Sequence, residues 1–188
     1  MNILFSKSSL VMNHTWFVLW FTGLSWAGKT TLSDAVFEKL QSMDLARIQQ
    51  LDGDLVREHI TKDLGFSKED REENIRRITF IAWLLSQHGV GVLATFISPY
   101  TAMRQHVKEH TTNFIEVYVN APLGVCEDRD VKGLYAKARS GEIKQFTGIS
   151  DPYEAPTHPD IEVRTDLLSL EASVDQVVHY LKQHNHIS

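Results

Sequence analysis

Cysteine is almost absent from this chain of 188 residues, which contains only Cys126. One thiol cannot form an internal disulfide, so the chain is not a small secreted domain held together by disulfides. Apolar residues adjoin Cys126, which favours a packed thiol over a reactive one. We therefore expect a reducing compartment and assign the chain to the cytoplasm.

An excess of positive charge and long apolar segments are also missing. Acidic residues outnumber basic ones by 24 to 19, and the pI is near 6.0. This balance argues against nucleic acid or a membrane surface as a partner. The apolar run at 17–21 is far shorter than the roughly 20 residues that cross a bilayer. Any anionic ligand must therefore be held by local clusters of Arg and Lys.

The clearest pattern that is present is Gly23-x-x-x-x-Gly28-Lys29-Thr30, between an apolar run and a segment of helical periodicity. This order of strand, glycine-rich turn and helix predicts a P-loop, whose backbone N–H groups cradle phosphate oxygens. Lys29 is expected to reach the β- and γ-phosphates of ATP or GTP, and Thr30 to bind Mg²⁺. The expected nucleotide contacts are Gly23, Leu24, Ser25, Trp26, Ala27, Gly28, Lys29, Thr30 and Thr31.

Periodicity along the rest of the chain predicts alternating strands and helices. The expected strands are 17–21, 47–51, 90–97, 114–119 and 161–165, and the expected helices are 29–43, 55–61, 68–88, 101–110, 122–129 and 170–183. Such alternation predicts an α/β fold of the P-loop NTPase type, a three-layer sandwich around a parallel sheet of about five strands. Residues 1–13 are expected to be a disordered extension, and 14–188 a single domain. Residues 130–159 lack periodicity, which indicates a mobile lid.

Two carboxylates follow the second predicted strand, where parallel-sheet proteins place their ligands. Asp52 is expected to support Mg²⁺ and Asp54 to accept a proton from the acceptor hydroxyl, since phosphoryl transfer needs mainly positioning and charge neutralisation. An Asp-Gly-Asp turn without a catalytic role remains the alternative. Arg57 and Arg71 are candidate clamps for a second anion. Asn74 shares a helix face with Arg71.

Several further motifs resemble one family when they are taken in order. They are Gly23-Leu-Ser-Trp-Ala-Gly-Lys-Thr-Thr31, Leu51-Asp-Gly-Asp54, Asp63-Leu-Gly-Phe66, Asp70-Arg-Glu-Glu-Asn-Ile-Arg-Arg77, Phe96-Ile-Ser-Pro99, Arg129-Asp-Val-Lys-Gly-Leu-Tyr135 and Phe146-Thr-Gly-Ile149. The set resembles adenylylsulfate kinase (APS kinase) from about Trp16 to the C-terminus. Single motifs are shared with other kinases, whereas the ordered set is specific.

The resemblance implies transfer of the γ-phosphoryl group of MgATP to the 3′-hydroxyl of adenosine 5′-phosphosulfate (APS), giving 3′-phosphoadenosine 5′-phosphosulfate (PAPS) and ADP. The implied contacts with APS are Asp54, Leu55, Arg57, Phe66, Arg71, Asn74, Ile97, Ser98, Lys132, Gln145 and Phe146. Arg77 is a further candidate contact, with an ordinary surface cation as the alternative. Asp54 is the implied base, Lys29 and Lys132 stabilise the transferred group, and Arg129 joins the ATP site. Ser98 has been treated in the family as a phosphoserine intermediate, which direct in-line transfer makes unnecessary.

The resemblance also implies a homodimer, and the chain is too short to include a fused ATP sulfurylase, which must then be a separate chain. Three positions depart from the family: Trp26 replaces a small residue, Leu55 replaces Asn, and Gln145 occupies a variable position. Two other readings remain open. One is a P-loop kinase for another hydroxyl acceptor, such as a sugar acid, shikimate or a nucleoside; the other is a nucleotide-binding subunit or switch.

Overall fold

The computed structural model describes residues 16–188, so the predicted extension at 1–13 lies outside the described residues. Five parallel strands form one sheet in the order β2-β3-β1-β4-β5. The strands are β1 (Val18–Thr22), β2 (Ile48–Asp52), β3 (Gly91–Thr95), β4 (Phe114–Asn120) and β5 (Ile161–Arg164). The predicted parallel sheet of five strands is confirmed.

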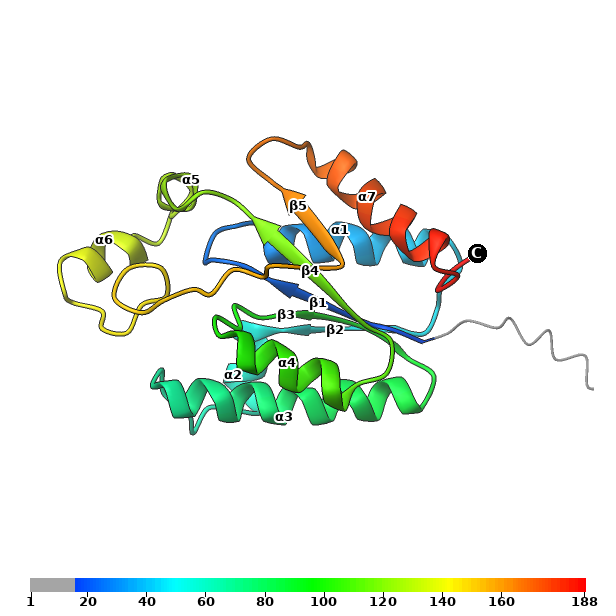
Figure 1. The fold of residues 1–188 in the computed structure, drawn as a ribbon, viewed down its shortest axis with the longest axis horizontal. Helices are drawn as coiled ribbons and strands as arrows, with labels where there is room; N and C mark the ends of the chain where they lie inside the picture. The colour runs from blue at the N-terminus through cyan, green and yellow to red at the C-terminus, as the bar shows by residue number, and fades with distance from the viewer. Residues whose placement is uncertain (1–15) are drawn as a thin grey trace, which may run out of the picture.

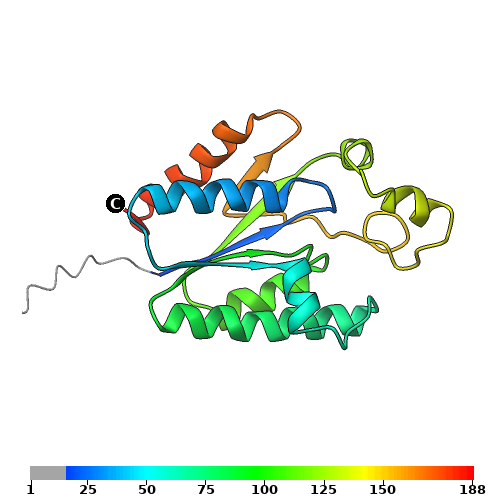
Figure 2. The same cartoon turned by 180° about the vertical axis from the view of Figure 1, so that it is seen from behind.

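Helices cover both faces of the sheet (Figure 1). One face carries α1 (Lys29–Ser42) and α7 (Leu170–Gln183), and the other carries α2 (Gly53–His59), α3 (Lys68–Gln87) and α4 (Thr101–His110). The short helices α5 (Leu123–Asp128) and α6 (Leu134–Arg139) follow β4 and lie beyond the end of the sheet (Figure 2). This is the three-layer α/β sandwich predicted from the alternation of elements.

The central strand β1 is buried on both of its faces. Leu19 and Phe21 belong to the core cluster shared with α1 and α7, whereas Val18 and Trp20 belong to the cluster shared with α3 and α4. Successive side chains of a strand point to opposite faces, so a strand between two helical layers must be apolar throughout. The run before the glycine-rich loop is therefore apolar because it forms a strand in the middle layer of the sandwich.

All five strands run in the same direction, so the segments after them gather at one edge of the sheet. The glycine-rich loop follows β1, Asp52 ends β2, Ser98 follows β3, and Thr165 follows β5. The lid region follows β4 by way of α5 (Figure 1). Residues far apart in the sequence thus meet at the carboxyl edge.

The predicted boundaries differ from the structure at a few points. Helix α2 begins at Gly53 and not at 55, because the Asp52 carboxylate accepts hydrogen bonds from the backbone N–H groups of Asp54 and Leu55 and caps the helix. Strand β3 ends at Thr95 because the chain turns at Ser98, whose φ is 39°. The predicted lid contains α6, which the sequence pattern missed. That helix buries the Tyr135 ring, which is 2% exposed.

None of the helices within residues 16–188 is long and apolar enough to span a bilayer.

Packing of α7 against the sheet predicts how two leucines of the same helix contribute to stability. Leu181 is fully buried, whereas Leu170 is 47% exposed. We expect Leu181→Ala to lower the free energy of unfolding by about 2–5 kcal/mol, because it leaves a cavity in the core. Leu170→Ala is the matched control and should change it by less than about 0.5 kcal/mol. Urea denaturation measures both, and equal losses would contradict the packing described here.

Candidate active site

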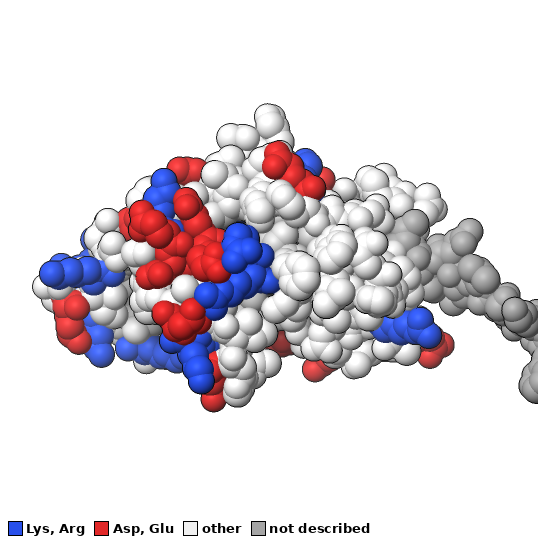
Figure 3. Space-filling model, turned by 90° about the horizontal axis from the view of Figure 1, so that it is seen from below, with Lys and Arg blue, Asp and Glu red and all other residues white. Residues whose placement is uncertain are grey.

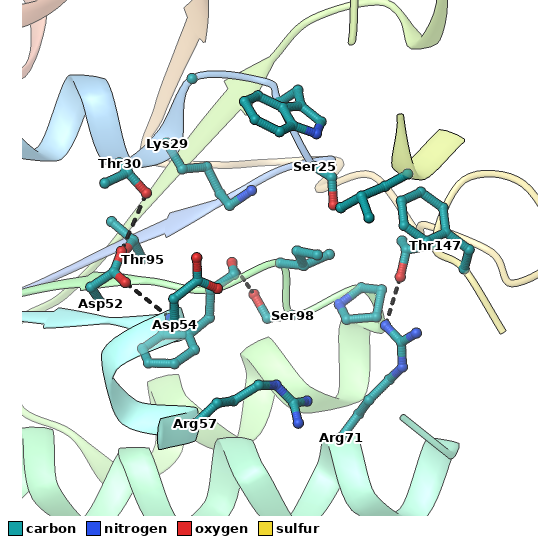
Figure 4. A pocket seen from close by; sticks show the side chains of 18 of the residues that line it. Ser25, Lys29, Thr30, Asp52, Asp54, Arg57, Arg71, Thr95, Ser98 and Thr147 are labelled. Carbon is teal, nitrogen blue, oxygen red and sulfur yellow. Dashed lines mark hydrogen bonds between the residues drawn. The ribbon is translucent and has the colours of Figure 1, made fainter. Parts of the chain in front are cut away.

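A cavity of about 920 Å³ opens at the carboxyl edge of the sheet. Its volume is near the upper end of the range for small-molecule sites. The glycine-rich loop and the arginines of α2 and α3 line this same cavity (Figure 4). The predicted site residues among its lining are Ser25, Trp26, Gly28, Lys29, Thr30, Thr31, Asp52, Asp54, Arg57, Phe66, Arg71, Asn74, Ile97, Ser98, Arg129, Lys132, Gln145 and Phe146.

In the glycine-rich loop at 23–30, the backbone at Gly23 leaves no room for a side chain. A Cβ atom there would lie 2.4 Å from the carbonyl oxygen of Val119, which is too close for any residue except glycine. Gly28 has a φ of 99°, in the left-handed region, and stands directly before α1. Trp26 also has a positive φ, 61°, which is uncommon for a bulky residue. The loop is held tightly at the N-terminus of α1, where helix geometry favours an anion.

Lys29 extends from the first residue of α1 into the cavity (Figure 4). Its Nζ donates to the carbonyl oxygens of Gly23 at 3.1 Å and Leu24 at 2.8 Å. Burial lowers the pKa of Lys29 to about 8, although the carboxylates of Asp52 and Asp54 favour the charged form. The ammonium group therefore rests against neutral oxygens, and its positive charge is available to phosphate.

Asp52 is fixed at the end of β2 by hydrogen bonds to both of its oxygens. Oδ2 accepts from the hydroxyls of Thr30 at 3.3 Å and Thr95 at 3.1 Å, and Oδ1 accepts from the N–H of Asp54 at 2.9 Å. One carboxylate beside one hydroxyl is an oxygen donor set that suits Mg²⁺. Residues 16–188 contain no cluster of three or more His, Cys, Asp or Glu that would hold a metal alone. Mg²⁺ would thus need phosphate oxygens and waters as further ligands, which is its usual preference.

Asp54 lies in the first turn of α2 and is exposed to the cavity. Figure 4 shows it between Lys29 on one side and Arg57 on the other. A carboxylate in that position has access to both halves of the cavity.

Arg57 and Arg71 lie on the opposite side of the cavity from Lys29 (Figure 4). Arg57 donates to the carbonyl oxygen of Gly65 at 3.1 Å, and its guanidinium carbon is 4.4 Å from the centre of the Phe66 ring. Burial and the neighbouring charge of Arg71 lower the pKa of Arg57. Two adjacent cations and an exposed phenyl ring make this side suited to an anion that carries an aromatic base.

Arg71 also joins α3 to the lid. Its Nε donates to the carbonyl oxygen of Phe66 at 2.9 Å, and a terminal nitrogen donates to the Thr147 hydroxyl at 2.6 Å. The other terminal nitrogen donates to the carbonyl oxygen of Gln145. Phe146, between these two lid residues, packs edge-on against Tyr135, with ring centres 5.0 Å apart. The predicted lid residues therefore face the same cavity as the arginines.

Two predicted acceptor contacts, Leu55 and Arg77, do not line the cavity. Leu55 is exposed on α2. Arg77 makes two hydrogen bonds of 2.8 Å to Asp63 and one of 2.8 Å to Glu73, which raise its pKa. Helical spacing places Arg77 near the helix face that carries Arg71 and Asn74. The ion pairs with Asp63 and Glu73 nevertheless keep its side chain at the surface, outside the cavity. Gly23, Leu24 and Ala27 belong to the loop without lining the cavity.

Ser98 lines the cavity, but its hydroxyl has partners in the interior. The residue is 2% exposed, and its Oγ accepts from Trp20 Nε1 at 3.0 Å and donates to the Thr22 hydroxyl at 3.1 Å. A phosphoryl group on this oxygen would replace the hydrogen that Ser98 donates, and it would have to fit among these buried side chains. The geometry gives Ser98 a part in holding the chain after β3 and does not favour it as a phosphoryl carrier.

Near its start, the lid region is attached to the back of the glycine-rich loop. Arg129 donates to the hydroxyl and carbonyl oxygens of Thr165 at 3.1 and 2.7 Å, and the Thr165 hydroxyl donates to the carbonyl oxygen of Ala27 at 2.7 Å. Tyr135 donates to the carbonyl oxygen of Ser25 at 3.0 Å. Arg129 and Lys132 thereby lie at the cavity, as predicted from the sequence motif.

Sequence reasoning missed several residues of the cavity. Thr95 orients Asp52. It could have been predicted, because it is a polar residue at the carboxyl end of an apolar strand. Thr147 binds Arg71, and no pattern in the sequence pointed to that contact. The lining also includes Thr165, Leu168, Leu170 and Ser173, from β5 to the start of α7.

Comparison with known proteins gives one consistent result. The family model described as adenylylsulphate kinase matches residues 15–164. The chain is 60% identical over 168 residues to a probable adenylyl-sulfate kinase of Pseudomonas aeruginosa, covering 89% of this chain and 78% of that one. It is 58% identical over 170 residues to the adenylyl-sulfate kinase of Halothermothrix orenii, covering 90% and 91% of the two chains.

A solved structure of the Mycobacterium tuberculosis APS kinase, in complex with AMPPNP and APS, is similar to this chain with a TM-score of 0.84 and 41% identity. The similarity covers 89% of this chain and 98% of that one. The match of the family model over most of the sequence agrees with the ordered motifs and with the cavity that they form. The chain belongs to the adenylylsulfate kinase family.

Proposed function

We propose that this protein transfers the γ-phosphoryl group of MgATP to the 3′-hydroxyl of APS, producing PAPS and ADP. The observation that carries the proposal is that the glycine-rich loop and the arginine-and-phenylalanine side line one cavity. The Mycobacterium tuberculosis relative was solved with both AMPPNP and APS. In-line transfer needs two nucleotides that face one another, and the cavity has a side suited to each.

Each residue has a distinct part in the proposed reaction. Lys29 holds the β- and γ-phosphates and neutralises the charge that develops on the transferred group. Asp54 accepts the proton of the attacking hydroxyl, because it lies between the two sides of the cavity. Lys132 adds positive charge from the lid. Asp52 and Thr30 would hold Mg²⁺, which would supply charge neutralisation at the phosphates.

The acceptor nucleotide is held by the opposite side of the cavity. Arg57 and Arg71 bind its anionic phosphosulfate, and Phe66 and Phe146 enclose its adenine. Asn74 is buried at the same side and accepts a hydrogen bond of 2.7 Å from Thr61, which fixes its amide. Sugar acids and shikimate have no base to stack, so the two phenylalanines favour a nucleotide over those acceptors.

The protein's setting is part of the same proposal. We place it in the cytoplasm, with ATP sulfurylase supplied by a separate chain and a lid at about 130–159 that moves during turnover. Residues 14–188 then act as one kinase domain.

Helix α3 supports the proposal of a homodimer. Its N-terminal half carries the charged residues from Lys68 to Arg77, whereas 78–87 has none and exposes Phe80, Trp83 and Leu84. Figure 3 shows charges gathered over one half of this face and a largely uncharged surface over the other. Exposed apolar patches of this kind mark interfaces. We propose that this half of α3 contacts a second copy of the chain.

Substitution of Lys29 and Asp54 tests the reaction. In a coupled ADP-release assay with APS, we expect Asp54→Asn to lower kcat by about 10²–10⁴-fold, because it removes the base. Lys29→Ala should lower kcat by about 10²–10³-fold, because it removes a charge stabilising the transferred group. Asp44→Asn, at an exposed turn far from the cavity, is the control and should match the parent. Comparable turnover of gluconate or shikimate by the parent would contradict the proposed acceptor.

The lowered pKa of Lys29 predicts a pH dependence. Below a pH of about 8 the free enzyme carries the ammonium form, and above it the charge needed for phosphate is lost. We therefore expect kcat/KM for ATP to fall as pH rises through about 8, while kcat at saturating ATP declines only at higher pH, because bound phosphate favours the charged form. A kcat/KM that stays constant from pH 7 to 9.5 would show that Lys29 does not titrate there.

The proposed dimer has its own test. We expect Trp83→Glu to shift the parent protein from dimer to monomer in light scattering coupled to gel filtration, because it buries a charge in the contact. Leu167→Glu, at an exposed position in the turn between β5 and α7, should leave the dimer intact. A monomeric parent, or a dimeric Trp83→Glu variant, would refute an interface on this half of α3.

A further inference from the structure

The hydroxyl of Tyr153 belongs to a chain of hydrogen bonds behind the main cavity. The Tyr153 oxygen lies 3.0 Å from the hydroxyl of Thr22, which is fully buried at the end of β1. The Thr22 hydroxyl also donates to the carbonyl oxygen of Ile97 at 2.7 Å and accepts from Ser98 Oγ at 3.1 Å. Three separate segments therefore meet at a single oxygen atom.

Counting protons on Thr22 fixes the direction of its bond with Tyr153. A threonine hydroxyl has one hydrogen and two acceptor lone pairs. Its hydrogen goes to Ile97, so its oxygen must receive the bond from Tyr153. The one hydrogen of the Ser98 hydroxyl is shared between the Thr22 oxygen at 3.1 Å and the carbonyl oxygen of Phe96 at 3.3 Å. Burial raises the pKa of Tyr153, which keeps the phenol protonated and able to donate. Removal of the Tyr153 hydroxyl would thus leave one lone pair of a buried oxygen unused.

The three joined segments each belong to a different part of the proposed site. Thr22 directly precedes Gly23 of the glycine-rich loop, and Ile97 and Ser98 line the cavity after β3. Tyr153 lies in the return segment, which we define as residues 151–154, in the later part of the lid region. Tyr153 is not itself part of the cavity lining.

Further contacts hold the return segment to the residues after β3. The Tyr100 hydroxyl donates to the Asp151 carboxylate at 2.7 Å, and the N–H of Glu154 donates to the carbonyl oxygen of Pro99 at 2.8 Å. The buried guanidinium of Arg104 donates to the carbonyl oxygens of Ser98 at 2.8 Å and Glu154 at 2.6 Å. Of these contacts, the Tyr153 bond joins the return segment to the central strand.

We propose that Tyr153 is a positioning residue that fixes the lid over the acceptor nucleotide. Its hydroxyl fastens the return segment to the strand that ends in the glycine-rich loop. Gln145 and Phe146 precede Tyr153 in the lid region, and the N–H of Asp151 in the return segment donates to the carbonyl oxygen of Phe146 at 3.1 Å. A parallel bridge between Thr147 and Asp151 adds a second contact between the two stretches. Loss of the bond therefore displaces the lid side of the acceptor site and leaves the loop side in place. This inference rests on the proposed reaction with APS.

The test is Tyr153→Phe, which removes one oxygen and keeps the ring. We expect KM for APS to rise about 5–30-fold and kcat to fall several-fold, which is the range for the loss of one buried hydrogen bond. The Kd of AMPPNP measured without APS should change by less than twofold. Tyr180→Phe, on α7, is the matched control and should match the parent. An unchanged KM for APS, or an equal loss of AMPPNP affinity, would overturn the proposal.

A double-mutant cycle identifies the partner. Thr22→Val removes the hydroxyl that Tyr153 binds. Adding Tyr153→Phe to that variant should therefore raise KM for APS little further. Thr22→Ser keeps the hydroxyl and should restore KM for APS to near the parent value, which separates the bond from a general folding defect. If the rise in KM for APS in the double variant equals the product of the rises in the two single variants, the two residues act independently and the proposal is overturned. If the parent protein turns over APS, the proposed function holds whatever these variants do. If the parent does not turn over APS, the proposed function itself is refuted.

Discussion

Burial of β1 on both faces is the constraint on which the rest of the site depends. Because Leu19 and Phe21 pack toward one helical layer and Val18 and Trp20 toward the other, the strand has no freedom to shift. It ends at Thr22 and Gly23, so the glycine-rich loop starts from a fixed point. Gly23 then passes so close to Val119 of the neighbouring strand that only glycine fits. The position of the loop backbone is set by the core before any polar group is considered.

The cations of the cavity differ from those elsewhere in the way they are bound. Among the described residues, the hydrogen-bond partners of Lys29, Arg57 and Arg71 are carbonyl or hydroxyl oxygens. Arg76, Arg77 and Arg139 instead pair with carboxylates at the surface. A neutral acceptor orients a cation without cancelling its charge, whereas a carboxylate does both. The cavity thus keeps its positive charge although the protein as a whole is acidic.

This difference also shows why the sequence predicted some site residues and not others. The glycine-rich loop, Asp52 and the parallel sheet follow from local spacing and apolar runs, which the chain carries within short windows. Arg71 and Arg77 are both close to Asn74 on one helix, and no local feature separates them. What separates them is Asp63, from the loop before α3, and Thr147, from the lid.

Contacts between distant segments account for the remaining gaps. Helix α6 lacked a periodic signal because it is six residues long and is held mainly by one buried tyrosine. The family resemblance suggested Ser98 as a phosphoserine intermediate. The orientation of its hydroxyl is instead set by Trp20 and Thr22, which are more than 70 residues away in the sequence. Sequence patterns indicate which residues gather at an edge, whereas side-chain direction depends on partners that only the fold brings together.

The neutral partners of the cavity cations have a consequence for how nucleotides are captured. The net charge of −5 repels a polyanion at long range, and this repulsion is screened beyond about 8 Å at physiological ionic strength. The attraction operates within the cavity, where Lys29 and Arg57 are partly shielded from solvent. Capture therefore depends on diffusion to the mouth of the cavity and not on steering by the whole molecule. Salt that screens the overall negative charge therefore reduces the repulsion of an approaching nucleotide.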